Sequence, residues 1–269
     1  MMLALAAGVA FGGAAHARQI DIHNGNCGYS TSYDVRVSSG GIDFSRDTGK
    51  PTQVSMHDGQ LRVDGRNVAV SADDAARLRA YEAQVRALLP EVASVAREGV
   101  DIGYAAMRTV MVTFAANESD RRRMIDRLDE NRRKALAHID EGLGKGVWQR
   151  HDLDDTIGDG IGESVADLVG KVTGDAVTAA LSGDQSKVAA LQARAESLDK
   201  SIDREVNARA DALKERAEAM CPRLSELDQL QQHFQFRLQD GSRLQLLDRD
   251  PNFQDNKKLV TATERPRAG

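Results

Sequence analysis

Residues 33–70 alternate between apolar and polar side chains with a period of two. Val35 and Val37 are flanked by polar neighbours, and the alternation resumes after three glycine-containing pairs: Gly40-Gly41, Asp58-Gly59 and Asp64-Gly65. Alternation that is broken by such pairs is typical of short antiparallel strands joined by tight turns. We therefore predict a small antiparallel β-meander within residues 18–70, with an apolar face that other elements must cover.

The periodicity becomes helical after Ser71, which is a typical helix N-cap residue. An apolar stripe begins at Leu78, Tyr81 and Val85 and continues past Pro90, where we expect the helix either to kink or to stop and restart. A second stripe covers about residues 119–139. Three glycines follow this stripe and predict the end of the second helix: Gly142, Gly144 and Gly146.

Residues 157–182 form a third pattern, in which small residues recur at every fourth position. The row consists of Gly158, Gly162, Ala166, Gly170 and Gly174. Because small residues let a neighbouring backbone approach closely, we interpret this segment as an amphipathic helix that packs tightly against another helix. The alternative is a membrane-associated helix. A transmembrane span is excluded because a charge recurs every four residues, and each costs about 2.5–3.5 kcal/mol at the bilayer centre. An interfacial helix is disfavoured because the segment is acidic and contains no aromatic residue.

Residues 186–220 contain neither Gly nor Pro, and apolar residues recur at steps of three and four with one slip near Val206. This pattern predicts a long, coiled-coil-like helix of some 50 Å, at about 1.5 Å per residue. We regard its seam as a candidate interaction surface, with intramolecular packing as the alternative. The seam residues are Val188, Leu191, Leu198, Ile202 and Leu213.

The remaining segments complete an α+β, predominantly helical fold. Within residues 223–247, alternating apolar residues on both sides of Asp240-Gly241 predict a C-terminal β-hairpin. Residues 248–269 are polar and predict a disordered tail. We expect the β-meander of residues 18–70 to pack against the amphipathic helices of residues 71–222.

The first 17 residues bear on where the protein works. They form an apolar run that closes in Ala15-His16-Ala17, a pattern typical of a signal-peptidase site, although no Lys or Arg precedes the run. We expect cleavage after Ala17 and a soluble periplasmic protein. In such an oxidising compartment, Cys27 and Cys221 most simply form one disulfide, with two unpaired thiols as the alternative.

Composition and motifs offer little catalytic chemistry. A net charge of −5 disfavours nucleic acid, which requires a concentrated basic surface. The chain has no HExxH, GxSxG, P-loop or dinucleotide-binding motif, and Asp155 to Glu163 match an EF-hand only in part. We therefore expect no metal, cofactor or enzymatic activity, and favour a helical scaffold or chaperone-like module that binds other envelope proteins or itself. A membrane-associated protein acting through residues 157–182 is the alternative.

The order of these features resembles a known family. The segment LRVDGRNVAVS leads into a helix that contains LRAYEAQVRALLPEV, and a Gly-rich segment then precedes a cysteine at the end of a long helix. This order resembles the YggN-like family of uncharacterised periplasmic proteins of Gram-negative bacteria. The resemblance covers Cys27 to Cys221, and residues from Leu224 onward look like an extension. It implies a periplasmic location and two partnered cysteines, but no catalytic residues.

Overall fold

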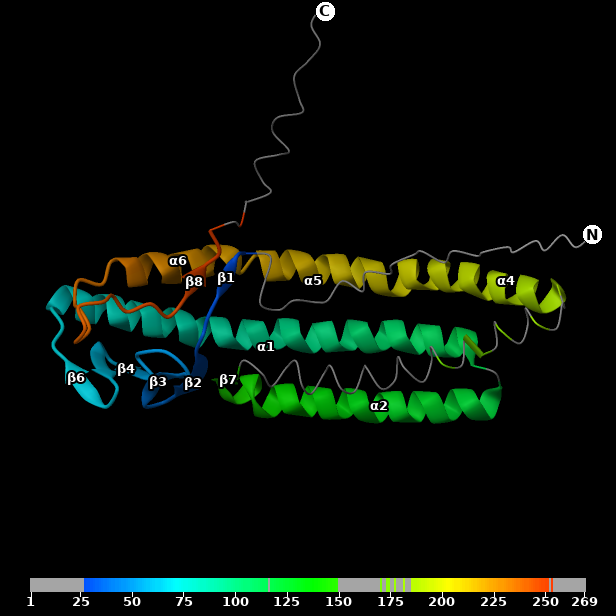
Figure 1. The fold of residues 1–269 in the computed structure, drawn as a ribbon, viewed down its shortest axis with the longest axis horizontal. Helices are drawn as coiled ribbons and strands as arrows, with labels where there is room; N and C mark the ends of the chain where they lie inside the picture. Colours follow the sequence, from blue (N-terminus) through cyan, green and yellow to red (C-terminus); the bar gives the residue numbers. More distant parts are fainter. Residues whose placement is uncertain are drawn as a thin grey trace, which may run out of the picture.

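The computed structural model describes residues 27–115, 117–149 and 185–251, together with residues 170, 173–174, 177, 181 and 253. Its fold is α+β and predominantly helical, as predicted. Figure 1 shows the sheet at one end of a long central helix, with further helices along both sides of that helix. Gly158, Gly162 and Ala166 of the small-residue row lie outside the described residues, as does the expected signal peptide.

The predicted meander is present as five consecutive antiparallel strands. Asp58-Gly59 and Asp64-Gly65 both have positive φ at each residue, which is the geometry of two-residue hairpin turns. A sixth strand follows the second helix in sequence. It pairs with β2 (Asp34–Ser38), the first strand of the meander, and places Trp148 opposite Val35. The strands, in spatial order, are β6 (Arg66–Val68), β5 (Gln60–Val63), β4 (Gln53–His57), β3 (Gly41–Ser45), β2 (Asp34–Ser38) and β7 (Val147–Trp148).

The central helix α1 (Ala72–Phe114) begins where the sequence predicts, because the Ser71 hydroxyl accepts a hydrogen bond from the Asp74 backbone N–H at 3.1 Å. It remains helical through Pro90, so of the two alternatives the stop and restart is not the one found. The helix α2 (Glu118–Glu141) ends at Gly142, as predicted. In Figure 1, α2 lies along one side of α1, while α4 (Gln185–Ile202), α5 (Ala208–Glu218) and α6 (Cys221–Gln232) lie along the other.

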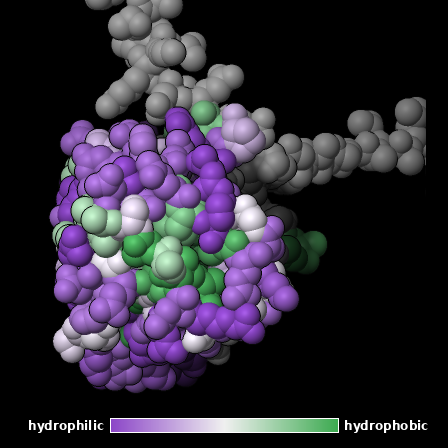
Figure 2. Space-filling view, turned by 90° about the vertical axis from the view of Figure 1, so that its left-hand side faces the viewer, coloured by the Kyte–Doolittle hydropathy of each residue, from purple (hydrophilic) through white to green (hydrophobic). Residues whose placement is uncertain are grey.

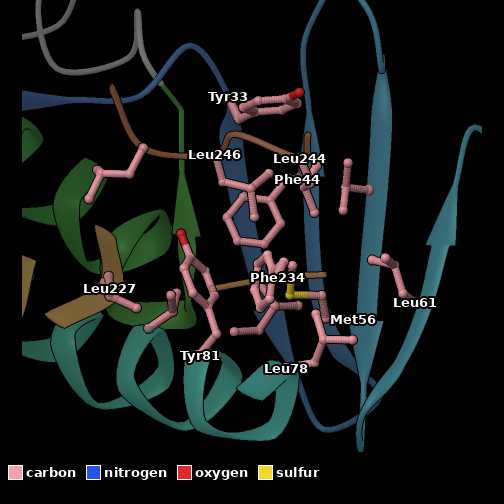
Figure 3. Packing of buried hydrophobic residues seen from close by; sticks show 14 of the residues in the cluster. Tyr33, Phe44, Met56, Leu61, Leu78, Tyr81, Leu227, Phe234, Leu244 and Leu246 are labelled. Carbon is pink, nitrogen blue, oxygen red and sulfur yellow. The ribbon is translucent and has the colours of Figure 1, made fainter. Parts of the chain in front are cut away.

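A first hydrophobic core joins the sheet, the first half of α1, α6 and residues 234–247; we call this part the body. Figure 3 shows Tyr81 of α1 and Phe234 facing Phe44 of the sheet. The rings of Phe44 and Tyr81 have centroids 6.3 Å apart, and those of Tyr81 and Phe234 lie 6.1 Å apart. This chain of aromatic contacts fixes α1 and the C-terminal segment over the apolar face of the sheet.

Residues 234–247 differ in detail from the predicted hairpin. Two extended stretches turn at Asp240-Gly241, where the Leu238 N–H donates to the Ser242 carbonyl at 3.0 Å. Their apolar side chains enter the core beneath the sheet instead of extending its edge. The paired C-terminal strand is β8 (Asp248–Arg249), antiparallel to β1 (Tyr29–Ser30), so the first residues of the expected tail are ordered.

A second hydrophobic core lies between the second half of α1 and α2 and extends away from the sheet. We call this part the arm: α1 from Ala93 onward, α2, and residues 185–218. The long helix predicted for residues 186–220 contains a π-helical turn, η3 (Asp203–Asn207), between α4 and α5. The turn contains Val206, which is 9% exposed. Apolar positions spaced by four drift around an α-helix, and one wider turn returns them to the same face, which explains the slip in the sequence.

The predicted disulfide between Cys27 and Cys221 is present. It joins residues 194 apart in sequence, with a Cα–Cα distance of 5.2 Å. One half-cystine precedes β1 and the other is the first residue of α6, so the bond ties the start of the described chain to the C-terminal part of the body.

Candidate functional site

The described part of the candidate interaction seam faces the chain's own central helix. Leu198, Ile202 and Leu213 are partly buried, and the Leu213 side chain approaches to 3.7 Å of the position that a Cβ on Gly99 of α1 would take. These contacts agree with the intramolecular alternative. Val188 and Leu191 lie in α4, and their side chains fall outside the description.

Two residues of the small-residue row are described, Gly170 and Gly174. Gly170 and Gly174 are helical, yet a Cβ added to either would meet no heavy atom of the described residues within 4 Å. On α1, Gly99 lies in ordinary van der Waals reach of the Leu213 side chain of α5, and the sequence pattern did not single out this glycine. Small residues permit a close approach, but only the packing decides which of them is used.

A concavity of about 270 Å³ opens between α2 and α5, over α1. We call it the arginine pocket. Its lining comes from three helices that are distant in sequence: Asp101, Tyr104, Ala105 and Arg108 from α1, Asp129 and Arg132 from α2, and Arg209 from α5.

Ion pairs between helices hold the arginines of this pocket. Arg132 of α2 binds the Asp101 carboxylate through Nε and Nη2, at 2.8 and 2.7 Å. Arg108 of α1 reaches both carboxylate oxygens of Asp129 at 3.2 Å. Arg209 of α5 donates to Glu98 through Nε and Nη2, at 3.2 and 2.8 Å. The pairs thus connect α1 to both of its neighbours around one concavity.

Tyr104 of α1 also lines the arginine pocket. The residue is only 3% exposed, and its hydroxyl is buried with no hydrogen-bond partner among the described residues. Burial raises the pKa of this phenol above its ordinary value, so the hydroxyl keeps its proton at neutral pH. Most buried polar groups are hydrogen-bonded, so an unpaired one marks a position with unused binding capacity.

Two other concavities have structural explanations. One lies beside α6, where the buried Gln231 donates to the Leu247 carbonyl at 2.6 Å and to Asp228 at 2.9 Å. The Gln231 side-chain carbonyl also accepts from two backbone N–H groups, so this cluster anchors the C-terminal segment. The other lies on the polar outer face of the sheet. Trp148 also lines this concavity; it pairs with Val35 in the sheet and packs against both hydrophobic cores.

The end of the body carries apolar surface that faces solvent. Figure 2 views this end, where β6 and the first turn of α1 lie, and shows apolar side chains at the centre of a hydrophilic rim. The partly buried Val63, Val68 and Val70 belong to the strands and the connection at this end. They are the outermost layer of the body's core.

No group of three or more His, Cys, Asp or Glu side chains among the described residues is arranged to hold a metal ion. No helix in that part of the chain is both long and apolar enough to cross a membrane. Sequence reasoning missed the arginine pocket, because its residues form no linear motif.

The chain is similar to one family of proteins of unknown function. A family model described as "Protein of unknown function (DUF2884)" matches residues 27–247. No curated protein and no solved structure matches the chain. The match ends after the segment that covers the sheet, so residues 224–247 are part of the shared unit. They are not the extension that the sequence resemblance indicated.

Proposed function

The chain belongs to the DUF2884 family of proteins of unknown function, and we propose that it is a non-enzymatic, periplasmic binding module for other envelope polypeptides. The observation that carries this proposal is the position of the exposed large apolar side chains. Among the described residues these are Val112, Val177 and Leu181, with exposures of 44%, 50% and 83%. All three belong to the arm or to the segment that leads into it.

The two parts of the molecule differ in how they bury apolar surface. The body encloses its core between a sheet, helices and the C-terminal segment, apart from the partly buried apolar patch at its end (Figure 2). In the arm, helices lie side by side along α1, and the side chain of Val112 near the end of α1 remains exposed. Exposed apolar surface on helices is a common means of holding other polypeptides.

The proposed location is supported by the Cys27–Cys221 disulfide, which is typical of proteins from an oxidising compartment. The apolar run of residues 1–17 and the resemblance to YggN-like proteins support the same location.

The proposal is tested by aggregation of an unfolded envelope protein. A urea-denatured outer-membrane β-barrel protein is diluted into buffer with and without the full chain, and light scattering is recorded. We expect the wild type to suppress scattering. Val112→Asp and Leu181→Asp should lose most of that effect, because each places a charge on apolar contact surface.

Gln192→Asp is the matched control, because it adds the same charge at an exposed position of α4 without removing an apolar side chain. It should suppress aggregation as the wild type does. Equal suppression by all variants would contradict a role for these apolar side chains. Flotation of the chain with liposomes, but no effect on aggregation, would favour the membrane-associated alternative.

A further inference from the structure

The arginine pocket requires an explanation beyond the packing of the arm. Its three arginines come from α1, α2 and α5, so the cluster exists only when the arm is assembled. Their side chains are 41–51% exposed. Ion pairs between such exposed groups contribute about 0–1 kcal/mol each. Stability alone is therefore a weak reason to gather three guanidinium groups around one concavity.

Each arginine keeps hydrogen-bond donors after its ion pair is counted. Arg108 uses Nη1, whereas Arg132 and Arg209 use Nε and Nη2. The remaining guanidinium nitrogens make no hydrogen bond to the described residues. A guanidinium carries five N–H donors in a planar fork that matches carboxylate and phosphate oxygens, so the unused donors are suited to oxyanions.

The lining offers unused donors instead of a net positive charge. Asp101, Asp129 and Glu98 each balance one of the three arginines, so an oxyanion is recognised through the guanidinium N–H groups that these ion pairs leave unused. The Tyr104 hydroxyl adds a donor that is protonated and unpaired. The small side chain of Ala105 leaves space on α1 between Asp101 and Arg108.

We propose that the arginine pocket binds an oxyanion, a phosphoryl or carboxylate group, between Arg108, Arg132 and Arg209 with the Tyr104 hydroxyl beneath it. The volume of about 270 Å³ lies just below the range of pockets for drug-sized ligands, about 300–1,000 Å³, and suits one small charged group. The source of the oxyanion is either a free phosphate or an acidic side chain of a bound polypeptide. Val112 of the proposed polypeptide-binding surface lies one helical turn beyond Arg108 on α1, whereas Val177 and Leu181 belong to the segment before α4.

Titration calorimetry of the full chain at low ionic strength tests the site, because salt screens exposed charges. The probes are inorganic phosphate and a decapeptide of glutamates. We expect saturable binding of at least one probe. Arg209→Gln should weaken this binding about tenfold or more, since the bound anion loses a charge-assisted hydrogen bond. Tyr104→Phe should weaken binding about threefold or more without lowering the melting temperature, because it removes a hydroxyl that is unpaired in the free protein.

Arg216→Gln provides the matched control. Arg216 also lies on α5 and bonds across to α1, at Ser94 Oγ (2.9 Å), but it does not line the pocket. It should bind both probes as the wild type does. Binding of phosphate alone assigns the site to small anions, and binding of the peptide assigns it to acidic side chains.

No binding of either probe overturns the proposal, as does equal weakening by Arg209→Gln and Arg216→Gln. The Leu181→Asp variant separates the two proposals, because Leu181 does not line the pocket. If this variant fails to suppress aggregation yet binds phosphate normally, the oxyanion site is independent of the polypeptide-binding surface.

Discussion

Removal of the Cys27–Cys221 disulfide should destabilise the protein more than any single change in its cores. The bond closes a loop between residues 194 apart. In the chain-entropy model, closing a loop of this size lowers the entropy of the unfolded chain enough to contribute about 5 kcal/mol at 25 °C. Whole domains are stable by about 5–15 kcal/mol, so the bond accounts for a large share of the total.

Urea denaturation of the full chain, followed by circular dichroism, measures this contribution. With an m-value of about 2–3 kcal/mol per M, a loss of 5 kcal/mol lowers the midpoint by roughly 2 M. The Cys27→Ser/Cys221→Ser double variant should show this shift, and the wild type in reductant should unfold at the same midpoint. The m-value should also rise, because an unlinked unfolded chain exposes more surface.

Thiol titration provides the complementary check. The denatured, unreduced wild type should contain no reactive thiol, and reduction should release two. Equal urea midpoints with and without reductant would refute the entropic reasoning, since they would mean that the unfolded chain gains no freedom when the loop is opened. A bond found between chains instead of within one would refute the pairing itself.

Two further predictions concern single features of the fold. Asp74 is 1% exposed and accepts hydrogen bonds from the Gln235 backbone N–H at 3.0 Å and from Arg77 at 2.9 Å. Asp74→Ala should therefore lower the free energy of unfolding, measured by urea denaturation, by about 1–3 kcal/mol. The exposed Asp73→Ala is its control, and equal losses in both variants would show that only the charge at the helix start matters. Insertion of one alanine after Glu205 should rotate α4 by about 100° relative to α5, because the π-helical turn already absorbs one extra residue and each further α-helical residue turns by that angle. Hydrogen exchange should then become faster in α4 while α6 keeps its protection. Glu205→Ala preserves the length and should behave as wild type, and unchanged exchange in the insertion variant would contradict the assigned role of the turn.

Local patterns determined most of the elements. Alternation around Val35 and Val37 and the Asp-Gly turns were sufficient to predict the meander, because strands and two-residue turns are specified by neighbouring residues. The Ser71 cap and the glycines after residue 141 located helix ends for the same reason. Even the irregularity at Val206 was visible, because a π-helical turn leaves a slip in the apolar spacing.

Other features depended on partners that are distant in sequence. The strand β7 has two residues, too few for any periodicity, and exists because it meets the edge of β2. Residues 234–247 alternate as a hairpin does, but they pack beneath the sheet because its apolar face needed a cover. Pro90 indicated an interruption, yet the residues on both sides of it are buried in the two cores, and α1 continues through it.

The candidate site belongs wholly to this second group. Periodicity identifies the face of a helix that is apolar, and it predicted the seam that includes Ile202 and Leu213. It does not identify the neighbour, which proved to be α1 of the same chain for the described part of that seam. The arginine pocket gathers Arg108, Arg132 and Arg209 from three helices, and in the sequence each is one more charge on a solvated face. Their convergence, with Tyr104 beneath them, was decided by tertiary packing alone, because only the relative placement of whole helices brings such residues together.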